Sequence, residues 1–576
     1  MKKVLQSTAL FVGVLVFGLL PAKIWAEDVQ IDGKDYRKLS VAEYRDKMKA
    51  GWIGQIAGVS WGAPTEFRFC GKIMPESELP QWTPDMINNA FGQDDLYVEM
   101  TFLRTMELYG LDCSIRQAGI DFANSEYPLW HANVCGRHNL RAGIAPPNSS
   151  RPEFSKCADD IDYQIEADFS GLISPGLPNN AVLMGEKFGR LMNYGDGMYA
   201  GQFVGAMYAE AFFETDVVKI IKKALQAIPA ECQYAEMVRD VLQWKEEFPN
   251  DWEACWNKIN EKYQLNPEYR KWSCSGVDSE FNIDAKINGA YILVGLLYGA
   301  GDLDETIKLA IRCGQDSDCN PSNAGGILFT TLGFNALPAR FSEKLDESSV
   351  FNHTAYNFPA LLDVCESLAT QAVEREGGFI REENGERFFY IPKEDVKPSV
   401  LTSSATPTDK PLEGDDARFN DEELDKIKFR ELTDKEALEK YLLGFEVVAT
   451  GPDMNPGFRR EYRGRENVYL IHPVDKKTPA ILAKTFTPEE NTVLKFFVTY
   501  HEEPEGDFVL EVKVNGRKVI DTPVSKKTVG QDGWLLVGVN LSKYAGQETK
   551  VEIFNVPNNW SFEGAYFSDF YLTKAK

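Results

Sequence analysis

Apolar residues recur three and four positions apart over much of residues 36–385, which is the spacing of helices that bury one face. Ile307 and Ile311 show this spacing, and Ser40 with Glu43 three positions later forms the capping box that opens a helix. Alternation of apolar and polar residues is scarce in this half of the chain. We therefore predict an all-α domain over residues 36–385.

From about residue 445 the pattern changes to short apolar or alternating runs, which is typical of β-strands. Asn515-Gly516 is a pair that favours a tight hairpin turn. We predict a β-sandwich domain, jelly-roll-like, over residues 420–576, with a short helix near its start. The predicted strands are Val468–Ile471, Val493–Tyr500, Phe508–Val514, Leu535–Val539 and Val551–Phe554.

The stretch between the two patterns, residues 391–418, differs from both in composition. It is rich in Ser, Thr and Asp, has few large apolar side chains and is interrupted by four prolines. Such a composition is typical of linkers. We therefore predict that residues 391–418 connect the two domains.

The first 26 residues have the pattern of an export signal. Lys2 and Lys3 precede an apolar run from Ala9 to Leu20, and small residues follow up to Ala26. The run is shorter than the roughly 20 residues of a transmembrane helix. We expect residues 1–26 to be a signal peptide and the chain to be periplasmic or secreted, without insertion in a membrane.

Composition narrows the range of partners. The chain has 576 residues with 62 Lys and Arg against 87 Asp and Glu, a formal net charge of −25. A surface with this charge repels phosphate backbones, so nucleic acid is a poor partner and a small molecule or glycan is the expected substrate. The ten cysteines show no C-x-x-C spacing, which favours buried thiols or an occasional disulfide over a metal–thiolate site.

Two acidic motifs, about 220 residues apart, each precede an apolar or small-residue helix. The first contains Gln93, Asp94 and Asp95, and the second contains Asp316 and Asp318. Carboxylates at a helix start are stabilised by the helix dipole, so each motif alone is explained by helix capping. Two aspartates two positions apart in a turn can also direct oxygens at one cation.

The glycine-rich segment Gly51–Phe67, together with these motifs, resembles the ADP-ribosylglycohydrolase family. That family has a glycine-rich helix leading into a G-A-P-x-E-F-like segment, matched here by Gly62 to Phe67. Its T-D-D-T, S-N-G-x-L-M and G-G-D-T-D-T-N motifs occur in the same order, matched by 93–96, 179–184 and 314–320. The resemblance implies the helical fold of that family.

The resemblance also implies a site and a reaction. The expected reaction is metal-dependent hydrolysis of an N- or O-glycosidic bond, in an ADP-ribosyl group or another glycoside. Because the chain is expected to be exported, an environmental glycoside is a more suitable substrate than ADP-ribose on intracellular proteins. Two Mg²⁺ ions are implied, with Mn²⁺ or Ca²⁺ as alternatives. The catalytic candidates are Glu66, Asp95 and Asp316, and the implied metal ligands are Gln93, Asp94, Asp95, Asp316, Asp318 and Cys319.

Three positions depart from the family pattern. Gln93 and Cys319 stand where the family has threonine, and Val59 stands where it has aspartate. A thiol is a poor ligand for Mg²⁺. The alternative hypothesis is therefore a non-catalytic protein that binds a glycan or a nucleotide sugar and has a degenerate metal site.

Other polar and aromatic residues are open to two interpretations. Glu166, Asp168 and Asp196 could line a pocket, although solvated loops are the simpler interpretation of their surroundings. His131 is interpreted as structural, and Trp130 as a core residue rather than a platform for a sugar. In the C-terminal domain, the run from Gly533 to Gly546 resembles a strand and turn of jelly-roll modules, which bind glycan or brace a catalytic domain.

Overall fold

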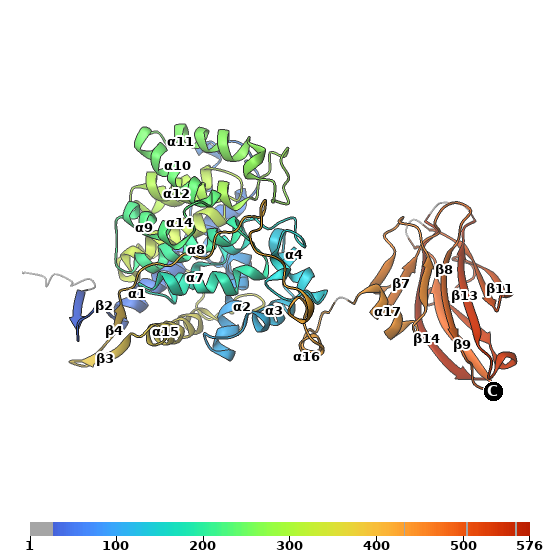
Figure 1. The fold of residues 1–576 in the computed structure, drawn as a ribbon. Helices are drawn as coiled ribbons and strands as arrows, with labels where there is room; N and C mark the ends of the chain where they lie inside the picture. The colour runs from blue at the N-terminus through green and yellow to red at the C-terminus, as the bar shows by residue number, and fades with distance from the viewer. Residues whose placement is uncertain (1–26, 431, 503–504, 559–561, 576) are drawn as a thin grey trace, which may run out of the picture. The chain divides into compact units, whose positions relative to one another are not determined.

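The computed structural model describes residues 27–430, 432–502, 505–558 and 562–575 (Figure 1). The predicted signal peptide, residues 1–26, lies outside the described residues. The chain divides into two compact units, the first ending at Phe429 and the second beginning at Arg430. Each unit has its own hydrophobic core.

Helices make up most of the first unit, as the sequence predicts. At its centre α8 (Asp196–Ala211) is buried along its whole length, because its many Gly and Ala residues let neighbouring helices approach. At one end α10, α11 and α12 pack together, and α15 lies beside a small sheet (Figure 1). The other helices of this unit are α1 (Val41–Gly62), α2 (Asp94–Tyr109), α3 (Ile115–Ala123), α4 (His131–Arg141), α5 (Asp162–Ile165), α6 (Asp168–Leu172), α7 (Pro178–Lys187), α9 (Val217–Ala224), α10 (Gln233–Glu247), α11 (Trp252–Ile259), α12 (Ala285–Gly299), α13 (Leu303–Arg312), α14 (Cys319–Leu332), α15 (Phe358–Arg375) and α16 (Asp421–Asp425).

Helices α1 and α14 lie in close contact through a row of glycines on α1. A β-carbon built on Gly54 would lie 2.4 Å from the carbonyl oxygen of Gly325, and one on Gly58 would lie 2.2 Å from that of Pro321. At Gly62 the corresponding distance to the Ser317 oxygen is 2.0 Å. Only glycine permits this separation of the two backbones, which fixes the position of the turn that precedes α14.

The first unit also contains a four-stranded antiparallel sheet, which the all-α prediction did not include. Its order is β1-β2-β4-β3, and β2 pairs with β4 although the two are far apart in the sequence. Most residues of β1, β2 and β3 are exposed or half-buried, so the apolar alternation that identifies a strand is weak here. The strands are β1 (Glu27–Ile31), β2 (Lys34–Ser40), β3 (Phe379–Glu383) and β4 (Glu386–Pro392).

Residues 391–418, which the sequence predicts as a linker, lie along the surface of the helical unit (Figure 1). The Tyr199 hydroxyl donates to the carbonyl oxygen of Val400 at 2.8 Å and accepts from the Thr402 amide at 2.8 Å. The buried Arg151 guanidinium forms an ion pair with Asp409 at 2.7 Å. The polar side chains and backbone of this stretch are therefore partners of the helical unit.

The residues that follow this stretch also belong to the helical unit, although the sequence places them in the sandwich domain from residue 420. Arg116 of α3 binds Glu423 of α16 at 2.7 Å. Phe419 and Ile427 are buried in the core of the first unit. We call residues 391–429 the strap, because this segment is held along the helical unit up to its last residue.

The second unit is a sandwich of two five-stranded sheets around one core, as predicted. The strand orders are β11-β10-β13-β8-β5 and β12-β9-β14-β7-β6. The hairpin joining β10 to β11 turns at Asn515 and Gly516, which adopt φ of +48° and +76°, as a type I′ turn requires. Its elements are α17 (Asp434–Tyr441), β5 (Glu446–Ala449), β6 (Gly457–Tyr462), β7 (Arg465–Ile471), β8 (Ala480–Phe486), β9 (Thr492–Thr499), β10 (Phe508–Val514), β11 (Arg517–Val524), β12 (Leu535–Asn540), β13 (Thr549–Val556) and β14 (Ala565–Lys574).

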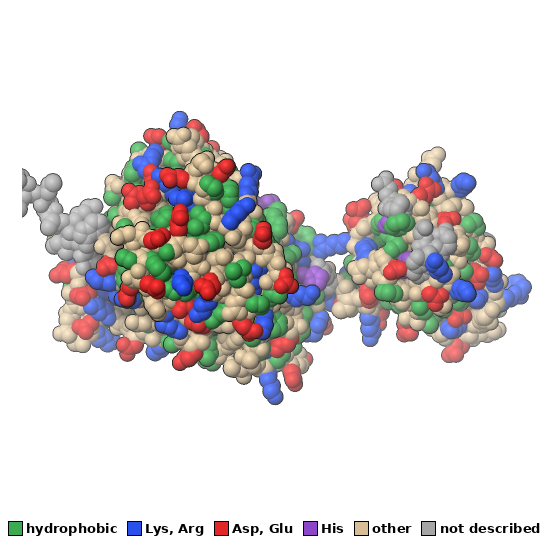
Figure 2. All heavy atoms as spheres, turned by 90° about the horizontal axis from the view of Figure 1, so that it is seen from above, with side chains coloured by type: hydrophobic (Ala, Val, Ile, Leu, Met, Phe, Trp, Pro, Cys, Tyr) green, Lys and Arg blue, Asp and Glu red, His purple; other side chains and the backbone are tan. Residues whose placement is uncertain are grey.

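The surface of the helical unit carries charges of both signs. Acidic and basic side chains are interspersed on the face drawn in Figure 2. Across the part of the chain that the structure describes, every helix is too short or too polar to cross a membrane.

Candidate functional site

The first acidic pair lies at the start of α2. Asp94 and Asp95 are the first two residues of this helix, and Gln93 precedes it in an extended conformation. Free amide groups and the helix dipole favour negative charge at this position. Asp95 is fully buried, whereas Asp94 is only partly covered and faces a pocket.

The second acidic pair lies in the turn before α14. Gly314 and Gln315 adopt φ of +82° and +55°, which reverses the chain between α13 and α14. The Gln315 side-chain amide donates to the carbonyl oxygen of Glu280 at 2.9 Å. This anchored turn places Asp316 and Asp318, both almost fully buried, at the start of α14.

Glu66 comes from the third motif, directly after α1 and the short helix η1 (Ala63–Thr65). The Thr65 and Ser317 hydroxyls lie 2.9 Å apart, which ties this segment to the turn before α14. The Phe67 amide donates to the carbonyl oxygen of Gln315 at 3.1 Å. Because of these contacts, the Glu66 carboxylate lies at the same pocket as Asp94.

The structure brings all the sequence-predicted site residues together. The ligand atoms of Asp316, Asp318 and Cys319 lie within 4.8 Å of one another. The Cys319 thiol donates to a carboxylate oxygen of Asp95 at 3.1 Å, which connects the two acidic pairs. Glu66, Gln93, Asp94, Asp316 and Cys319 line the pocket, and Asp95 and Asp318 are buried behind them.

Crowding of these carboxyl groups changes their protonation. Burial, together with the charges of Asp318 and Asp94, raises the pKa of Glu66 to about 8. Burial and the Asp318 charge raise the pKa of Asp94 to about 6. Burial and neighbouring acidic groups also raise the pKa of Asp95 and Asp316 well above the usual range. Such a cluster is costly to ionise unless a cation joins it.

The donor set fits a hard divalent cation. Asp95 Oδ2 and Asp316 Oδ1 are buried and have no hydrogen-bond donor among the described residues. Unpaired buried carboxylate oxygens are destabilising, and coordination of Mg²⁺ or Mn²⁺ would satisfy them. Cys319 is the exception, because its thiol lies among oxygen ligands but has little affinity for Mg²⁺.

The pocket in front of these acids has a volume of about 400 Å³ and aromatic walls. Trp130, interpreted from the sequence as a core residue, is 52% exposed, and His131 also lines the pocket. Burial lowers the pKa of His131 to about 4, so its ring is neutral at neutral pH. The other aromatic side chains of the pocket are Phe67, Tyr97 and Phe281.

Asp162 is a pocket residue that the sequence motifs did not indicate. Its two carboxylate oxygens accept the amides of Ala132 and Asn133, at 3.0 and 2.9 Å, and so fix the start of α4. Burial raises its pKa to about 7. A single acidic residue at the start of a short helix has no distinctive spacing, so only the fold reveals its place beside the cluster.

Three further acids, interpreted from the sequence as residues of solvated loops, are buried. Glu166 accepts a hydrogen bond from Asn133. Asp168 accepts from Asn323 of α14 at 2.7 Å, and Asp196 accepts from the Tyr234 amide at 2.7 Å. The interpretation as solvated loops was wrong, because these carboxylates fasten helices to one another inside the unit.

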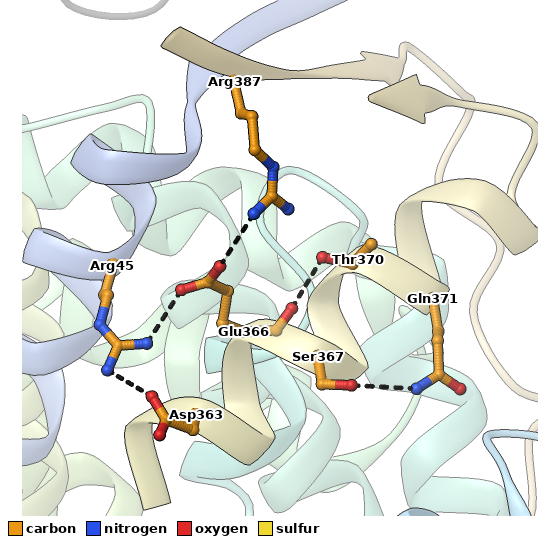
Figure 3. Close-up of a pocket in the computed structure, with 7 residues that line it drawn as sticks. All are labelled: Arg45, Asp363, Glu366, Ser367, Thr370, Gln371 and Arg387. Atoms are coloured by element: carbon orange, nitrogen blue, oxygen red, sulfur yellow. Dashed lines mark hydrogen bonds and ion pairs between the residues drawn. The ribbon is translucent and has the colours of Figure 1, made fainter. Parts of the chain in front are cut away.

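A second cavity, of about 440 Å³, is lined by charged and polar residues of α1, α15 and β4 (Figure 3). Its charges neutralise one another: Arg45 pairs with Asp363 at 2.6 Å and with Glu366 at 2.9 Å. Arg387 approaches Glu366 at 3.6 Å. This cavity therefore lacks the unpaired acidic oxygens that distinguish the first pocket.

Comparison with known proteins settles the family. The profile of the ADP-ribosylglycohydrolase family matches residues 40–377, more than half of the chain. The chain belongs to the ADP-ribosylglycohydrolase family. This family is hydrolytic and metal-dependent, and the matched region contains all the residues of the acidic cluster.

Solved structures show only distant similarity to this chain. An ADP-ribosylglycohydrolase-related protein complex is 15% identical over 57% of this chain and 99% of that chain, with a TM-score of 0.35. TmCBM61 in complex with β-1,4-galactotriose is 13% identical over 23% of this chain and 88% of that chain, with a TM-score of 0.17. A search of curated proteins found no match.

Proposed function

We propose that this ADP-ribosylglycohydrolase family member is a glycoside hydrolase that uses a divalent cation held by the acidic cluster. The observation that carries this proposal is the convergence of two acidic pairs and Glu66 on one aromatic-lined pocket. Two of the buried carboxylate oxygens lack a donor, which is the condition expected of ligands rather than of helix caps.

The residues of the pocket would have two different roles, metal binding and proton transfer. Asp94, Asp95, Asp316 and Asp318 would hold Mg²⁺ or Mn²⁺, with Gln93 close by. When bound, the cation would orient sugar hydroxyls and stabilise developing negative charge. Glu66 lies at the pocket rather than behind it, and its pKa of about 8 suits transfer of a proton near neutral pH.

The bond that is cleaved is an N- or O-glycosidic bond in a small molecule or glycan. The aromatic walls of the pocket, with Trp130 the most open to solvent, suit stacking against a sugar ring or a base. The assay compares ADP-ribosyl-arginine with a panel of ribosides and other glycosides, each with and without Mg²⁺. Metal-dependent release of a free sugar from one of them supports the proposal, whereas failure to cleave any of them contradicts it.

A thermal-shift titration with Mg²⁺, Mn²⁺ and Ca²⁺ tests the metal site directly. A ligand that binds the folded state raises Tm by mass action. We expect a metal-dependent rise that is lost in the Asp316→Asn/Asp318→Asn variant. The control is Asp363→Asn, which changes a paired and exposed carboxylate of the second cavity and should keep the full rise. An equal rise in all three proteins would contradict the assignment.

The second candidate function is binding without turnover, and Cys319 is the observation that favours it. Its thiol occupies a position among the oxygen ligands and already donates to Asp95. A protein of this kind would give no metal-dependent rise in Tm, yet would still bind a nucleotide sugar or glycan. Isothermal titration of metal-free protein with ADP-ribose and with oligosaccharides would distinguish the two functions.

We also propose that the chain is exported to the periplasm or beyond the cell. The basic start, the apolar run and the small residues before Ala26 support this location. Cleavage after Ala26 would leave β1, which begins at Glu27, intact. The mass of the intact protein recovered from the periplasmic or extracellular fraction tests the proposal, because an uncleaved cytoplasmic chain would contradict it.

A further inference from the structure

Sulfur, nitrogen and oxygen ligands gather beside the pocket, at a place that the proposed hydrolysis does not use. They come from α4, from the turn before α5 and from the loop before α12. None of these residues belongs to the acidic cluster described above. The residues are His131, Cys135, Cys157, Asp160 and Cys274.

Three of these side chains already have the spacing of metal ligands. The ligand atoms of His131, Asp160 and Cys274 lie within 4.8 Å of one another. His131 Nδ1 is 3.1 Å from Cys274 Sγ, and the Asp160 carboxylate accepts the Cys274 amide at 3.2 and 3.3 Å. The ligands of a tetrahedral zinc site are separated by about 3.6 Å, given bonds of about 2.1 and 2.3 Å. Only a small opening of this group would admit the ion.

Cys157 lies next to the group and links it to Cys135. The Cys157 thiol lies close enough to the Cys274 thiol to raise its own pKa, but it is outside the group whose ligand atoms lie within 4.8 Å of one another. Its Sγ also lies 3.2 Å from that of Cys135. Cys157 is therefore the nearest further thiol, and its side chain would have to turn inward to become a fourth ligand. The Cys135 thiol is placed to donate to a Cys157 thiolate from outside the site.

The loop that carries Cys274 is fastened to the same turn as Cys157 and Asp160. The Asp159 amide donates to the carbonyl oxygen of Trp272 at 3.1 Å, and the Ile161 amide donates to that of Ile283 at 3.0 Å. His131 adopts φ of +43° at the first position of α4. Backbone contacts on both sides thus hold the ligands in place before any ion binds.

We propose that His131, Cys157, Asp160 and Cys274 form a second metal site, one that binds Zn²⁺. Two thiols and an imidazole suit this borderline-soft ion, whereas the acidic cluster suits hard ions. Binding would convert the two thiols to thiolates and release two protons to the solvent. The Cys135 thiol would hydrogen-bond to the Cys157 thiolate, as outer groups do around zinc ligands.

The site would brace the wall of the pocket. His131 and Phe281 both line the pocket, and Phe281 lies in the loop that carries Cys274. A zinc ion would cross-link this loop to the start of α4 and to the turn before α5. The role is structural, because the four ligands leave no open position for a substrate.

Cobalt substitution of the full chain tests this site without relying on activity. Co²⁺ bound by thiolates absorbs strongly in the near ultraviolet, whereas Co²⁺ bound by carboxylates does not. We expect this absorption in the reduced wild-type protein and its loss in Cys157→Ser and in Cys274→Ser. Cys113→Ser, which removes a thiol outside the group, and Asp316→Asn/Asp318→Asn should both retain the absorption.

Zinc competition and thiol mapping complete the experiment. Zinc should displace cobalt at one equivalent per chain, and Cys135→Ser should weaken zinc binding by roughly tenfold. Retention of the absorption in both Cys157→Ser and Cys274→Ser would overturn the proposal, as would its absence in the wild type. So would a disulfide between any two of the three cysteines in protein purified without reductant. The Asp316→Asn/Asp318→Asn variant should lose the metal response of the acidic cluster but keep the cobalt absorption. It therefore distinguishes failure of the zinc proposal from failure of the acidic cluster.

Discussion

Cys319 is the side chain at which the acidic cluster departs from an all-oxygen ligand set. Its Sγ lies 3.1 Å from an Asp95 oxygen and 3.9 Å from an Asp318 oxygen, so it stands between the two acidic pairs. A thiol at this position weakens the preference for Mg²⁺ and favours softer ions. The identity of this one residue therefore bears on which cation the protein uses.

Replacing Cys319 by threonine, the family residue, is expected to strengthen Mg²⁺ binding. The hydroxyl oxygen is a hard donor, so the dissociation constant for Mg²⁺ should fall by roughly tenfold, about 1.4 kcal/mol. Thermal-shift titrations of wild type and Cys319→Thr give both constants. The matched control, Cys313→Thr, changes a nearby buried cysteine outside the site and should leave Mg²⁺ affinity unchanged. A weaker site in Cys319→Thr would contradict this account of the ligand set.

The raised carboxyl pKa values predict how the metal-free protein responds to pH. A raised pKa means that the folded state keeps protons which the unfolded state has released, so the free energy of unfolding falls as pH rises. The fall begins near the unfolded pKa values of about 4 and extends to the folded values, about 6 for Asp94 and about 8 for Glu66. Without metal, Tm should therefore decrease by several degrees from pH 5 to pH 8.

The control for this pH experiment is the Asp316→Asn/Asp318→Asn variant. It carries fewer like charges, so its Tm should decrease less over the same range. Added Mg²⁺ should restore Tm at pH 8 in wild type but not in the variant. A metal-free Tm that rises with pH would show that the cluster does not crowd its carboxyl groups in the folded state.

At the residue scale, the sequence predicts those residues of the site that belong to short motifs. Asp94, Asp95, Asp316 and Asp318 stand in recognisable patterns, and the structure brings them together. Asp162 has no such pattern, and the ligands proposed for zinc around Cys274 come from segments that are far apart in the sequence. Spacing along the chain reveals ligands only when they lie near one another in sequence.

At the scale of elements, the contact of α1 with α14 holds the second acidic pair in position. The glycine row on α1 brings the two backbones so close that a methyl group at Gly62 would overlap Ser317 and Asp318. The position of the turn before α14, and with it the distance between the two acidic pairs, depends on this contact.

Gly62→Ala is expected to lower both stability and metal affinity. The added methyl group must push the turn away, at a cost of about 1–3 kcal/mol. Urea unfolding measures the first effect and metal titration the second. Gly538→Ala is the control, because the nearest atom to its β-carbon would be 3.9 Å away, an ordinary contact distance. Unchanged metal affinity in a folded Gly62→Ala protein would show that the turn is positioned by other contacts.

Sequence patterns predicted strongly periodic elements better than weak ones. The mostly apolar run Phe508–Val514 forms β10 over the predicted residues, and its burial alternates from one residue to the next. Thr433 caps α17. The small sheet of the first unit was not predicted, because its strands are short and half exposed. Residues 391–418 of the strap were predicted as a linker, because their hydrogen bonds to the helical unit leave no periodic signal in the sequence.

At the scale of the whole molecule, the boundary between the compact units lies at Phe429 rather than within residues 391–418. The strap buries Phe419 and Ile427 in the first core and pairs Asp409 with Arg151. Composition alone cannot separate a free linker from a segment that is held along a folded unit by hydrogen bonds, ion pairs and a few buried side chains. The helical unit therefore includes the strap as part of its fold.

Two truncations test this division. A chain ending at residue 429 should keep the Tm of the helical unit and its response to metal, because its core is complete. A chain ending at residue 392 should lose about 3–6 kcal/mol, since Phe419 and Ile427 each contribute about 1.5–3 kcal/mol by burial. Calorimetry of both chains makes the comparison. Equal stability of the two would show that the strap adds nothing to the helical unit.

The two acidic pairs are contributed by segments about 220 residues apart, and this separation affects the kinetics of folding. Contacts between distant segments form late, because closing a long loop costs entropy before any contact compensates it. Here the late contact also brings like charges together, so the final step is opposed by repulsion unless a cation is present. A chain still being synthesised holds one pair without the other and has no complete site. Divalent cations should consequently accelerate the last step of refolding of the helical unit as well as stabilise its product, and tight metal binding becomes a signature of a completed helical unit.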